Sequence, residues 1–367
     1  MNALIAGGGT AGHVFPAIAL AQALAEAGDE VSFAGTAIGQ EARLVPAAGF
    51  PFVEVEAKPL VRKLSLRALS APIATLRSLS RCRPLVEQAD VIVGMGGYVS
   101  VPVALAALRA RRPLVLHEQN AVPGLSNRTL ARPARRVGLS FAEAARMFPR
   151  SARTVLTGNP VRPAIVRVPA ERDTLRKEAL EELDLVDDRR TVVVFGGSQG
   201  ALHVNRAIVD ALGALKDRED LQMVLLTGPA HLEAISALIP RGALRVRALG
   251  FLPRMELAYA AADLVVSRAG ATTVAELAVC GLPSILVPYP YATGRHQEAN
   301  ARALQRAGAA EVVLDDAIGG RVFASRIAAL MDDGSRLRAM GECATGWARP
   351  DAARTLADVV REAASGP

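Results

Sequence analysis

Two glycine-rich segments decide how this chain folds: Leu4-Ile-Ala-Gly-Gly-Gly-Thr-Ala-Gly12 and Val192-Val-Val-Phe-Gly-Gly-Ser-Gln-Gly200. Each follows a short apolar strand and opens an amphipathic helix. A strand-to-helix turn of this kind gathers backbone N–H groups at the positive end of a helix dipole, which suits a phosphate. Because such a turn begins each half of the chain, we predict two related domains that each bind a phosphorylated group.

Strand and helix patterns alternate along the whole chain, which is typical of parallel sheets with right-handed crossovers. The expected strands are Asn2–Ala6, Val31–Gly35, Val53–Val55, Val91–Gly94 and Leu114–His117, then Thr191–Phe195, Gln222–Thr227, Val246–Leu249, Leu264–Ser267, Ser284–Val287 and Glu311–Leu314. The rhythm stops at Asn159-Pro-Val-Arg-Pro163, so we place the domain boundary at about residue 163. The last expected helix, Ala352–Ala364, follows Pro350 and would return to the first domain.

Composition narrows the class of protein. A chain of 367 residues with 51% hydrophobic content can bury two cores of ordinary size. Its three cysteines, Cys82, Cys280 and Cys343, lie far apart, so we expect a reducing cytosol and neither a disulfide framework nor a zinc site. No secretory signal is expected at the amino terminus. The uncharged stretch Val91–Leu108 is broken by glycines and Pro102, which favours a buried strand, a turn and a helix over a membrane span.

The positive charge is concentrated in one segment, Ala57–Val86, which has seven basic residues and no acidic one. Leucines interleave with these bases at nearly helical spacing, and Pro72 predicts a kink. The pattern is compatible with a helix lying on an anionic membrane and with a core helix that has a solvated basic face. Nucleic acid is not an expected partner, because the chain is 4% aromatic and this segment has no aromatic residue for base stacking.

Two other readings of the first glycine segment are unfavourable. Gly7, Gly9 and Gly12 fit the G-x-G-x-x-G pattern of dinucleotide-binding oxidoreductases. That fold requires an acidic residue at the end of the second strand, where this chain has Gly35-Thr36. A nucleoside triphosphatase is disfavoured even more strongly, because no G-x-x-x-x-G-K-(S/T) loop occurs.

Further polar clusters follow the predicted strands, at the carboxyl ends where open α/β sheets bind ligands. They are Met95-Gly-Gly-Tyr98, His117-Glu-Gln-Asn120 with Asn127, Gly158-Asn-Pro-Val-Arg162, Ser267 to Glu276, and Arg295-His-Gln-Glu-Ala-Asn300. Three of these residues also have a purely structural interpretation. His117 could be a core histidine, Glu276 could compensate a helix dipole instead of binding a ribose diol, and Arg162 could pair with an acid instead of a phosphate.

In this order the motifs resemble, over essentially the whole chain, the MurG-type N-acetylglucosaminyltransferases of peptidoglycan synthesis, which make lipid II from lipid I. The matching segments are Gly8-Gly-Thr-Ala-Gly-His13, Gly96-Gly-Tyr98, His117-Glu-Gln-Asn120, Gly158-Asn-Pro-Val-Arg162, Gly196-Gly-Ser-Gln-Gly-Ala201, Arg268-Ala-Gly-Ala271 through Glu276, and His296-Gln297 with Asn300. The chain departs from the family at Ala11, which is usually glycine, and at Gly294-Arg295, where an acidic residue is common.

The resemblance implies a GT-B fold, α/β, with two Rossmann-like doubly wound parallel-sheet domains facing a cleft. The first domain (1–163) would bind the acceptor and associate with the membrane, and the second (164–347) would bind the UDP-sugar. A C-terminal helix (348–367) would pack back on the first domain. The implied reaction is an inverting transfer of N-acetylglucosamine from UDP-N-acetylglucosamine to the C4 hydroxyl of the N-acetylmuramyl group of lipid I.

The resemblance also assigns the site. The donor would contact Thr10, Ala11, Gly12, Asn120, Arg162, Ser198, Phe251, Leu252, Ala271, Thr272, Thr273, Val274, Ala275, Glu276 and Gln297. The acceptor would contact Gly9, Tyr98 and Asn127. For the base that deprotonates the acceptor hydroxyl we favour His13 over Glu118. No D-x-D triplet occurs, so we expect no metal and no cofactor, with helix N-termini and Arg162 supplying positive charge.

A lipid-linked acceptor places the enzyme peripherally on the cytoplasmic face of the plasma membrane, which favours the membrane interpretation of Ala57–Val86. The expected partners are UDP-N-acetylglucosamine, lipid I and an anionic membrane surface. Two rival hypotheses remain: another GT-B transferase with a different lipid or natural-product acceptor, and a nucleotide-sugar-binding module without catalysis.

Overall fold

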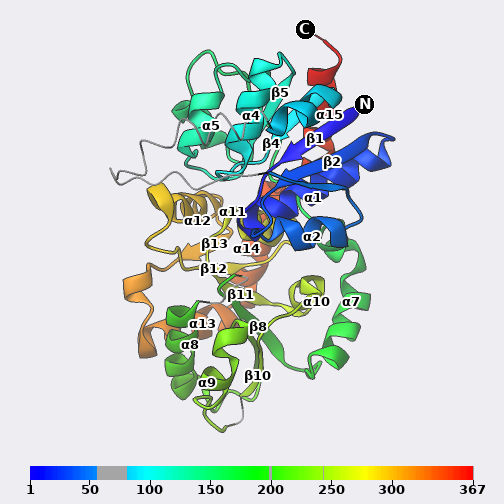
Figure 1. The fold of residues 1–367 in the computed structure, drawn as a ribbon. Coiled ribbons are helices and arrows are strands. Elements are labelled where there is room, and N and C mark those ends of the chain that lie inside the picture. Colours follow the sequence, from blue (N-terminus) through cyan, green and yellow to red (C-terminus); the bar gives the residue numbers. More distant parts are fainter. Residues whose placement is uncertain (56–80, 198–200, 243, 367) are drawn as a thin grey trace, which may run out of the picture. The chain divides into compact units, whose positions relative to one another are not determined.

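The structure is a computed structural model that describes residues 1–55, 81–197, 201–242 and 244–366 (Figure 1). Contacts divide the chain into two compact units, unit 1 (Met1–Arg162 with Pro350–Pro367) and unit 2 (Pro163–Arg349). Each unit is built on one parallel sheet. Most of the segment Ala57–Val86 lies outside the described residues, and residues 81–88 are helical.

Unit 1 has a seven-stranded sheet of order β3-β2-β1-β4-β5-β6-β7. The strands are β1 (Asn2–Ala6), β2 (Glu30–Gly35), β3 (Phe52–Glu54), β4 (Val91–Gly94), β5 (Leu114–Glu118), β6 (Arg136–Leu139) and β7 (Thr154–Leu156). The helices are α1 (Ala11–Glu26), α2 (Glu41–Ala47), α4 (Ser100–Arg109), α5 (Leu125–Leu130) and α15 (Ala352–Ala364), with a short helix η2 (Ala142–Met147). The strand order reverses between β1 and β4, which is where open α/β sheets place their ligands.

Both faces of the unit 1 sheet are covered, because successive residues of a strand point to opposite sides. Ala3 and Ile5 of β1 belong to the core formed with α1 and α15. Leu4 and Ala6 belong to the opposite core, formed with α4 and α5. The helix α15 is also held by Arg361, which donates to Asp29 (2.7 Å) and joins the end of the chain to the end of α1.

Unit 2 has a six-stranded sheet of order β10-β9-β8-β11-β12-β13. The strands are β8 (Arg190–Phe195), β9 (Leu221–Leu226), β10 (Arg245–Leu249), β11 (Leu264–Ser267), β12 (Ser284–Leu286) and β13 (Ala310–Val312). The helices are α6 (Pro163–Val166), α7 (Val168–Glu182), α8 (Leu202–Leu215), α9 (Leu232–Ser236), α10 (Met255–Ala261), α11 (Ala271–Val279), α12 (His296–Arg306), α13 (Gly320–Asp332) and α14 (Gly334–Trp347), with short helices η3 (Pro229–His231), η4 (Thr293–Arg295) and η5 (Asp315–Ala317).

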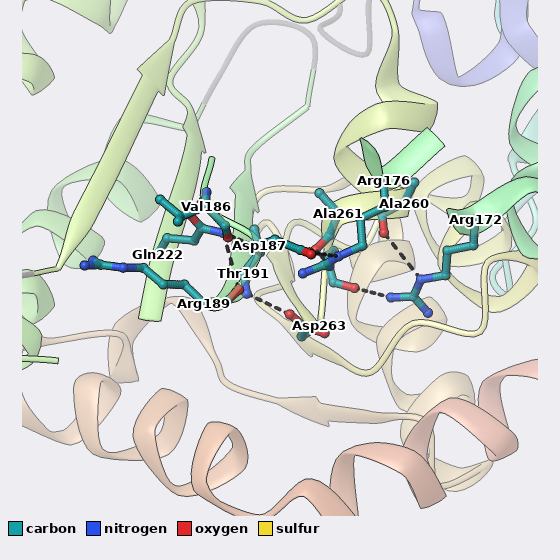
Figure 2. A network of polar contacts seen from close by, with 11 residues as sticks. Arg172, Arg176, Val186, Asp187, Arg189, Thr191, Gln222, Ala260, Ala261 and Asp263 are labelled. Atoms are coloured by element: carbon teal, nitrogen blue, oxygen red, sulfur yellow. Dashed lines mark hydrogen bonds and ion pairs between the residues drawn. The ribbon is translucent and has the colours of Figure 1, made fainter. Parts of the chain in front are cut away.

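Two arginines of α7 hold the carboxyl end of α10 (Figure 2). Arg172 donates to the carbonyl oxygens of Ala260 and Ala262, and Arg176 donates to that of Ala261 (2.9 Å). These are the last carbonyls of the helix, which have no partner within it and carry its negative end charge. These contacts fix the position of α10, which also carries Tyr259.

The expected strands are present in both units, but the strands β6 and β7 were not predicted. β6 and β7 have only four and three residues, too few to show a period of two. The uncharged stretch Val91–Leu108 forms β4, a glycine turn and most of α4. Among the described residues, no helix has both the length and the apolar character that crossing a bilayer requires.

Candidate functional site

The first glycine loop of unit 1 joins β1 to α1 and is organised around a buried carboxylate. Glu41, the first residue of α2, is 1% exposed. Its Oε2 accepts a hydrogen bond from the Gly9 amide (2.8 Å), and its Oε1 accepts from the Thr36 amide (3.0 Å) and hydroxyl (2.8 Å). The predicted open phosphate cradle is therefore wrong for Gly9, because the chain's own carboxylate already uses this amide. Glu41 was missed in the sequence, where its only signal is an acid soon after the second strand.

His13 lies in the first turn of α1, where its Nδ1 is 3.1 Å from the Thr10 hydroxyl. The ring edge lies against the turn after β4. A Cβ atom on Gly96 would be 3.1 Å from Cδ2 and 3.3 Å from Nε2 of His13. Gly96 also has a φ of +85°, so this turn requires glycine both for its backbone conformation and for the close approach to the imidazole.

His117, at the end of β5, is fully buried, and its Nε2 lies 3.0 Å from the carbonyl oxygen of Gly158. Burial and, to a smaller extent, the nearby His13 lower the pKa of His117 to about 4, while the hydrogen bond with Gly158 opposes the shift. The ring is thus neutral, with Nε2–H donating to the carbonyl. Its Nδ1 has no hydrogen-bond partner among the described residues. His117 is accordingly a core histidine.

Glu118 uses both carboxylate oxygens to organise the loop that follows β5. Oε1 accepts from the amide of Asn120 (3.0 Å), and Oε2 accepts from the amide of Gly124 (3.0 Å) and the side chain of Asn127 (2.9 Å). Burial raises the pKa of Glu118, and these hydrogen bonds oppose the rise. Both oxygens of Glu118 are thus engaged by the chain itself, and the choice of His13 over Glu118 as the base stays a prediction.

Other predicted acceptor and donor residues of unit 1 divide into buried and accessible groups. Asn127 is 3% exposed, and its amide nitrogen also donates to the carbonyl of His117 (3.1 Å). The expected contact of Asn127 with the acceptor conflicts with this burial, and its role is to hold the Glu118 loop. Tyr98 and Asn120 are half-buried, and a Cβ on Gly9 would be 3.5 Å from the Tyr98 ring.

The predicted phosphate ligand Arg162 is the last residue before unit 2. Its guanidinium lies over the ring of Phe15, 4.4 Å from the centroid. Phe15 belongs to α1, so a cation–π contact anchors Arg162 to the helix that carries His13. Ala11 and Gly12 occupy the first two positions of this same helix.

In unit 2, Gly196 and Gly197 follow β8, and Ser198, predicted to hold the diphosphate, lies outside the described residues. Gly197 has a φ of +100°. A Cβ on Gly196 would be 2.2 Å from that of Ala201, just before α8. The start of this turn therefore accepts only glycine.

The helix α11 presents the clearest ligand geometry of unit 2. It begins at Ala271 after Gly270, which has no side chain to cap the amides of the first turn at Ala271–Thr273. Such amides suit an anion. Further along, Glu276 is 5% exposed, and its Oε2 accepts a hydrogen bond from the fully buried hydroxyl of Tyr259 (2.8 Å). Tyr259 was missed in the sequence, where its only signal is one tyrosine within an alanine run.

The remaining predicted donor contacts of unit 2 follow β10 and β12. The side chain of Phe251 is exposed and that of Leu252 is buried. The Gln297 side chain accepts from the backbone amide of Tyr289 (2.9 Å), which fixes the loop after β12. Gly294 and Arg295, where the sequence departs from the family pattern, both adopt left-handed conformations. Arg295 also forms an ion pair with Glu298 (2.6 Å).

Arg268, at the end of β11, is buried and joins several loops. It donates to the carbonyls of Val287 and Pro288, and it pairs with Asp315, which also contacts His203 (2.7 Å). The described residues contain no group of three or more histidine, cysteine, aspartate or glutamate side chains that could hold a metal ion.

Comparisons with known proteins cover both units. The Glycosyltransferase family 28 N-terminal domain matches residues 3–139, and the Glycosyltransferase family 28 C-terminal domain matches residues 191–356. The chain is 41% identical over 376 residues to the UDP-N-acetylglucosamine--N-acetylmuramyl-(pentapeptide) pyrophosphoryl-undecaprenol N-acetylglucosamine transferase of Halothermothrix orenii, with 100% of both chains covered. It is 42% identical to the protein of the same name from Moorella thermoacetica, with 98% of each chain covered.

Solved structures agree with these relatives. MurG of Acinetobacter baumannii aligns with a TM-score of 0.79 and 31% identity, over 98% of this chain and 99% of that one. The calicheamicin glycosyltransferase CalG4 aligns with a TM-score of 0.65 and 17% identity, over 99% of this chain and 98% of that one, which is a likeness of fold alone. The expected two parallel-sheet domains of the GT-B fold are thereby confirmed.

Proposed function

Because this chain belongs to the MurG-type N-acetylglucosaminyltransferases of glycosyltransferase family 28, we propose that it transfers N-acetylglucosamine from UDP-N-acetylglucosamine to lipid I, giving lipid II. The observation that carries this proposal is the 41% identity to a transferase of that name over the full length of both chains. The described geometry fits the reaction, since unit 1 has an accessible histidine at a strand-to-helix turn and unit 2 has an uncapped helix N-terminus beside a buried carboxylate.

The reaction is a displacement at the anomeric carbon of the donor sugar. The C4 hydroxyl oxygen of the acceptor forms the new bond to that carbon while its proton passes to His13, and UDP leaves with the electron pair of the broken C–O bond. Attack opposite the leaving group inverts the anomeric configuration. When His13 Nδ1–H donates to Thr10, Nε2 keeps the lone pair that accepts the proton.

The donor belongs to unit 2 in this proposal. Glu276 accepts hydrogen bonds from the ribose diol, and the Tyr259 hydroxyl holds the carboxylate in place. Uracil contacts the backbone at Phe251-Leu252, and Gln297 contacts the sugar. The first-turn amides of α11, together with Ser198 and its neighbours, bind the diphosphate.

Departure of UDP requires positive charge at the diphosphate. The helix dipole of α11 and the guanidinium of Arg162 supply it, so the proposed mechanism uses no metal ion. Thr10, Ala11, Gly12 and Asn120 are proposed contacts of the transferred sugar, and Gly9 and Tyr98 of the acceptor. Ala11 places a methyl group in the first turn of α1, beside these contacts.

Access to a lipid-linked acceptor requires a membrane-binding surface, which we assign to unit 1. The basic segment Ala57–Val86 contributes its charge, as its sequence predicts. A second basic feature is a cavity of about 390 Å³ at the amino-terminal end of the sheet, which we call the arginine cavity. Its lining has no acidic residue and includes five arginines: Arg111, Arg112, Arg132, Arg135 and Arg153. Arginine binds phosphate through its planar, bidentate donors, so this cavity suits anionic lipid headgroups.

Release of UDP from UDP-N-acetylglucosamine tests the function, measured with and without a lipid I analogue. We expect release that depends on the analogue, with a β-linked disaccharide product identified by NMR. Acceptor-independent binding without turnover would indicate a nucleotide-sugar-binding module. Turnover only with an unrelated lipid or natural-product acceptor would indicate a different GT-B transferase.

A further inference from the structure

Glu41 is a buried acid that the proposed reaction does not use. It lies between two segments that are distant in sequence, the first glycine loop and the end of β2, and accepts three hydrogen bonds from Gly9 and Thr36. Ionised carboxylates accept stronger hydrogen bonds than neutral groups do. The carboxylate thus acts as a fixed internal anion for the loop that carries Thr10.

The surrounding glycines leave room for this carboxylate and for nothing else. A Cβ on Gly8 would lie 2.2 Å from the carboxyl carbon of Glu41, and a Cβ on Gly39 would lie 2.1 Å from its Oε2. A Cβ on Gly35 would lie 2.5 Å from Cγ of Glu41. Three glycines, two in loops and one at the end of β2, therefore surround one side chain, and a Cβ at any of them would collide with it.

We propose that Glu41 is a positioning residue for the catalytic base, a role that rests on the proposed function of His13. Its carboxylate occupies the anion-binding concavity of the first glycine loop and fixes Gly9. The next residue, Thr10, is the N-cap of α1, and its hydroxyl lies 3.1 Å from His13 Nδ1. The path from Glu41 through Gly9 and Thr10 sets the orientation and the tautomer of the imidazole.

The Glu41 carboxylate also affects whether a phosphate can bind at the first glycine loop. A phosphate placed at the Gly9 amide would face a buried carboxylate, and like charges at such distances repel strongly in a medium of low dielectric constant. The two matched glycine turns of this chain therefore differ in purpose. The turn in unit 1 holds the chain's own carboxylate at Gly9 and positions the base.

The main test is Glu41→Gln, which keeps the size of the side chain but turns an N–H donor toward the Gly9 amide. We expect kcat to fall by about 10- to 100-fold, the usual cost of misplacing a catalytic group. The KM values for donor and acceptor should stay within about twofold. A fall in the acceptor KM would instead show that Glu41 repels a phosphate bound at this loop, and would overturn the proposal.

A matched control is Asp29→Asn. The Asp29 side chain is 6% exposed and holds Met1 and Arg361 in the same unit. Its loss should lower the midpoint of thermal unfolding and leave kcat unchanged. If Glu41→Gln does not fold, Thr36→Val provides a milder change, because it removes only the hydroxyl contact with the carboxylate. A full wild-type kcat in folded Glu41→Gln would contradict the proposal, and so would a full wild-type kcat in Thr36→Val where Glu41→Gln does not fold.

Two further measurements separate this inference from the proposed function. In a His13→Ala background, Glu41→Gln should cause no additional loss of turnover, whereas multiplicative losses would show that Glu41 acts independently of His13. Nitrogen NMR of the imidazoles, with His13 assigned by its absence in His13→Ala, needs no turnover. Glu41→Gln should shift the tautomer ratio of His13, and Asp29→Asn should not. If Glu41→Gln leaves the His13 signal unchanged, the positioning role is overturned, even if the enzyme is active. If Glu41→Gln shifts the signal but the wild-type protein has no transferase activity, only the proposed function is contradicted.

Discussion

The hydroxyl of Tyr259 donates a 2.8 Å hydrogen bond to Oε2 of Glu276, and both side chains are buried. Tyr259 comes from α10, which Arg172 and Arg176 hold from α7 (Figure 2). One oxygen of the carboxylate is therefore committed to the fold of unit 2. The carboxylate lies in α11, the helix that follows the carboxyl end of β11, where the ribose diol of the donor is proposed to bind.

This pair makes a prediction about donor affinity. Glu276→Ala should raise the KM for UDP-N-acetylglucosamine far more than the KM for the acceptor. Tyr259→Phe should raise the donor KM by about fivefold, because it removes one hydrogen bond worth about 1 kcal/mol. Steady-state kinetics with each substrate varied in turn will test both. Equal effects on the two substrates would contradict the ribose assignment.

His13 should carry the proton transfer. We expect His13→Ala to lower kcat by about two to four orders of magnitude, the range for loss of a general base, while donor binding measured by calorimetry persists. Thr10→Val should cause a smaller fall in kcat, since it removes the contact that orients Nδ1. Retention of more than about a tenth of the wild-type kcat in His13→Ala would reassign the base.

Turnover should not require a divalent cation, because helix N-termini and Arg162 neutralise the leaving diphosphate. Enzyme treated with a chelator and assayed in metal-free buffer should keep its full rate. Inactivation by the chelator that is reversed only by Mg²⁺ or Mn²⁺ would show that a metal ion supplies this charge.

Acid should destabilise unit 1 through His117. Its native pKa is about 4 and its ordinary value is 6.5, so between these values the unfolded chain binds a proton that the native chain does not. The free energy of unfolding therefore falls as the pH decreases through this range, by roughly 2 kcal/mol between about pH 7 and about pH 5. Urea unfolding of wild type and His117→Asn at the two values measures this contribution, which the variant should lack.

Glu118 acts in the opposite direction, because its raised native pKa means that the native state gains stability as the carboxyl is protonated. Comparing His117 with His117→Asn in a Glu118→Gln background therefore isolates the contribution of the histidine to the pH dependence of unfolding. An identical pH dependence with and without His117 in that background would contradict the prediction.

Membrane binding should depend on the basic segment. Replacing Arg67, Arg77 and Arg81 by glutamate should release the protein from anionic vesicles and slow its reaction with vesicle-embedded acceptor. A short-chain, water-soluble acceptor should be used nearly as before. Salt should weaken the wild-type binding, since the Debye length is about 8 Å at physiological ionic strength.

The arginine cavity should contribute separately to vesicle binding. We expect the triple replacement of Arg111, Arg132 and Arg153 by glutamate to weaken it as well. The matched control replaces three exposed arginines of unit 2, namely Arg241, Arg247 and Arg338. If the control releases the protein equally, net charge rather than a surface of unit 1 determines membrane binding.

Much of the fold follows from local sequence. The strands β1, β4 and β11 occupy their predicted residues, because buried parallel strands are short apolar runs bounded by glycine and polar residues. Polar clusters were expected at the carboxyl ends of strands: Glu118 is the last residue of β5, and His13 and Glu276 lie in the helices that follow β1 and β11. This part is predictable because the direction of a parallel strand fixes which of its ends faces the ligand.

Tertiary structure decided which of these polar residues are available for chemistry. Asn127 donates to Glu118 in the interior, and Glu41 fills a loop that its glycines alone would suggest is empty. Glu41 and Gly9 are 32 residues apart in the sequence, and Arg361 and Asp29 are 332 residues apart. No local pattern encodes them, because burial and hydrogen-bond partners arise only when distant segments pack. The sequence by itself determined two parallel α/β units with glycine turns at their first strands. Only the packed structure decided that the first turn binds the chain's own carboxylate, because Glu41 reaches Gly9 only when α2 packs beside the end of β1.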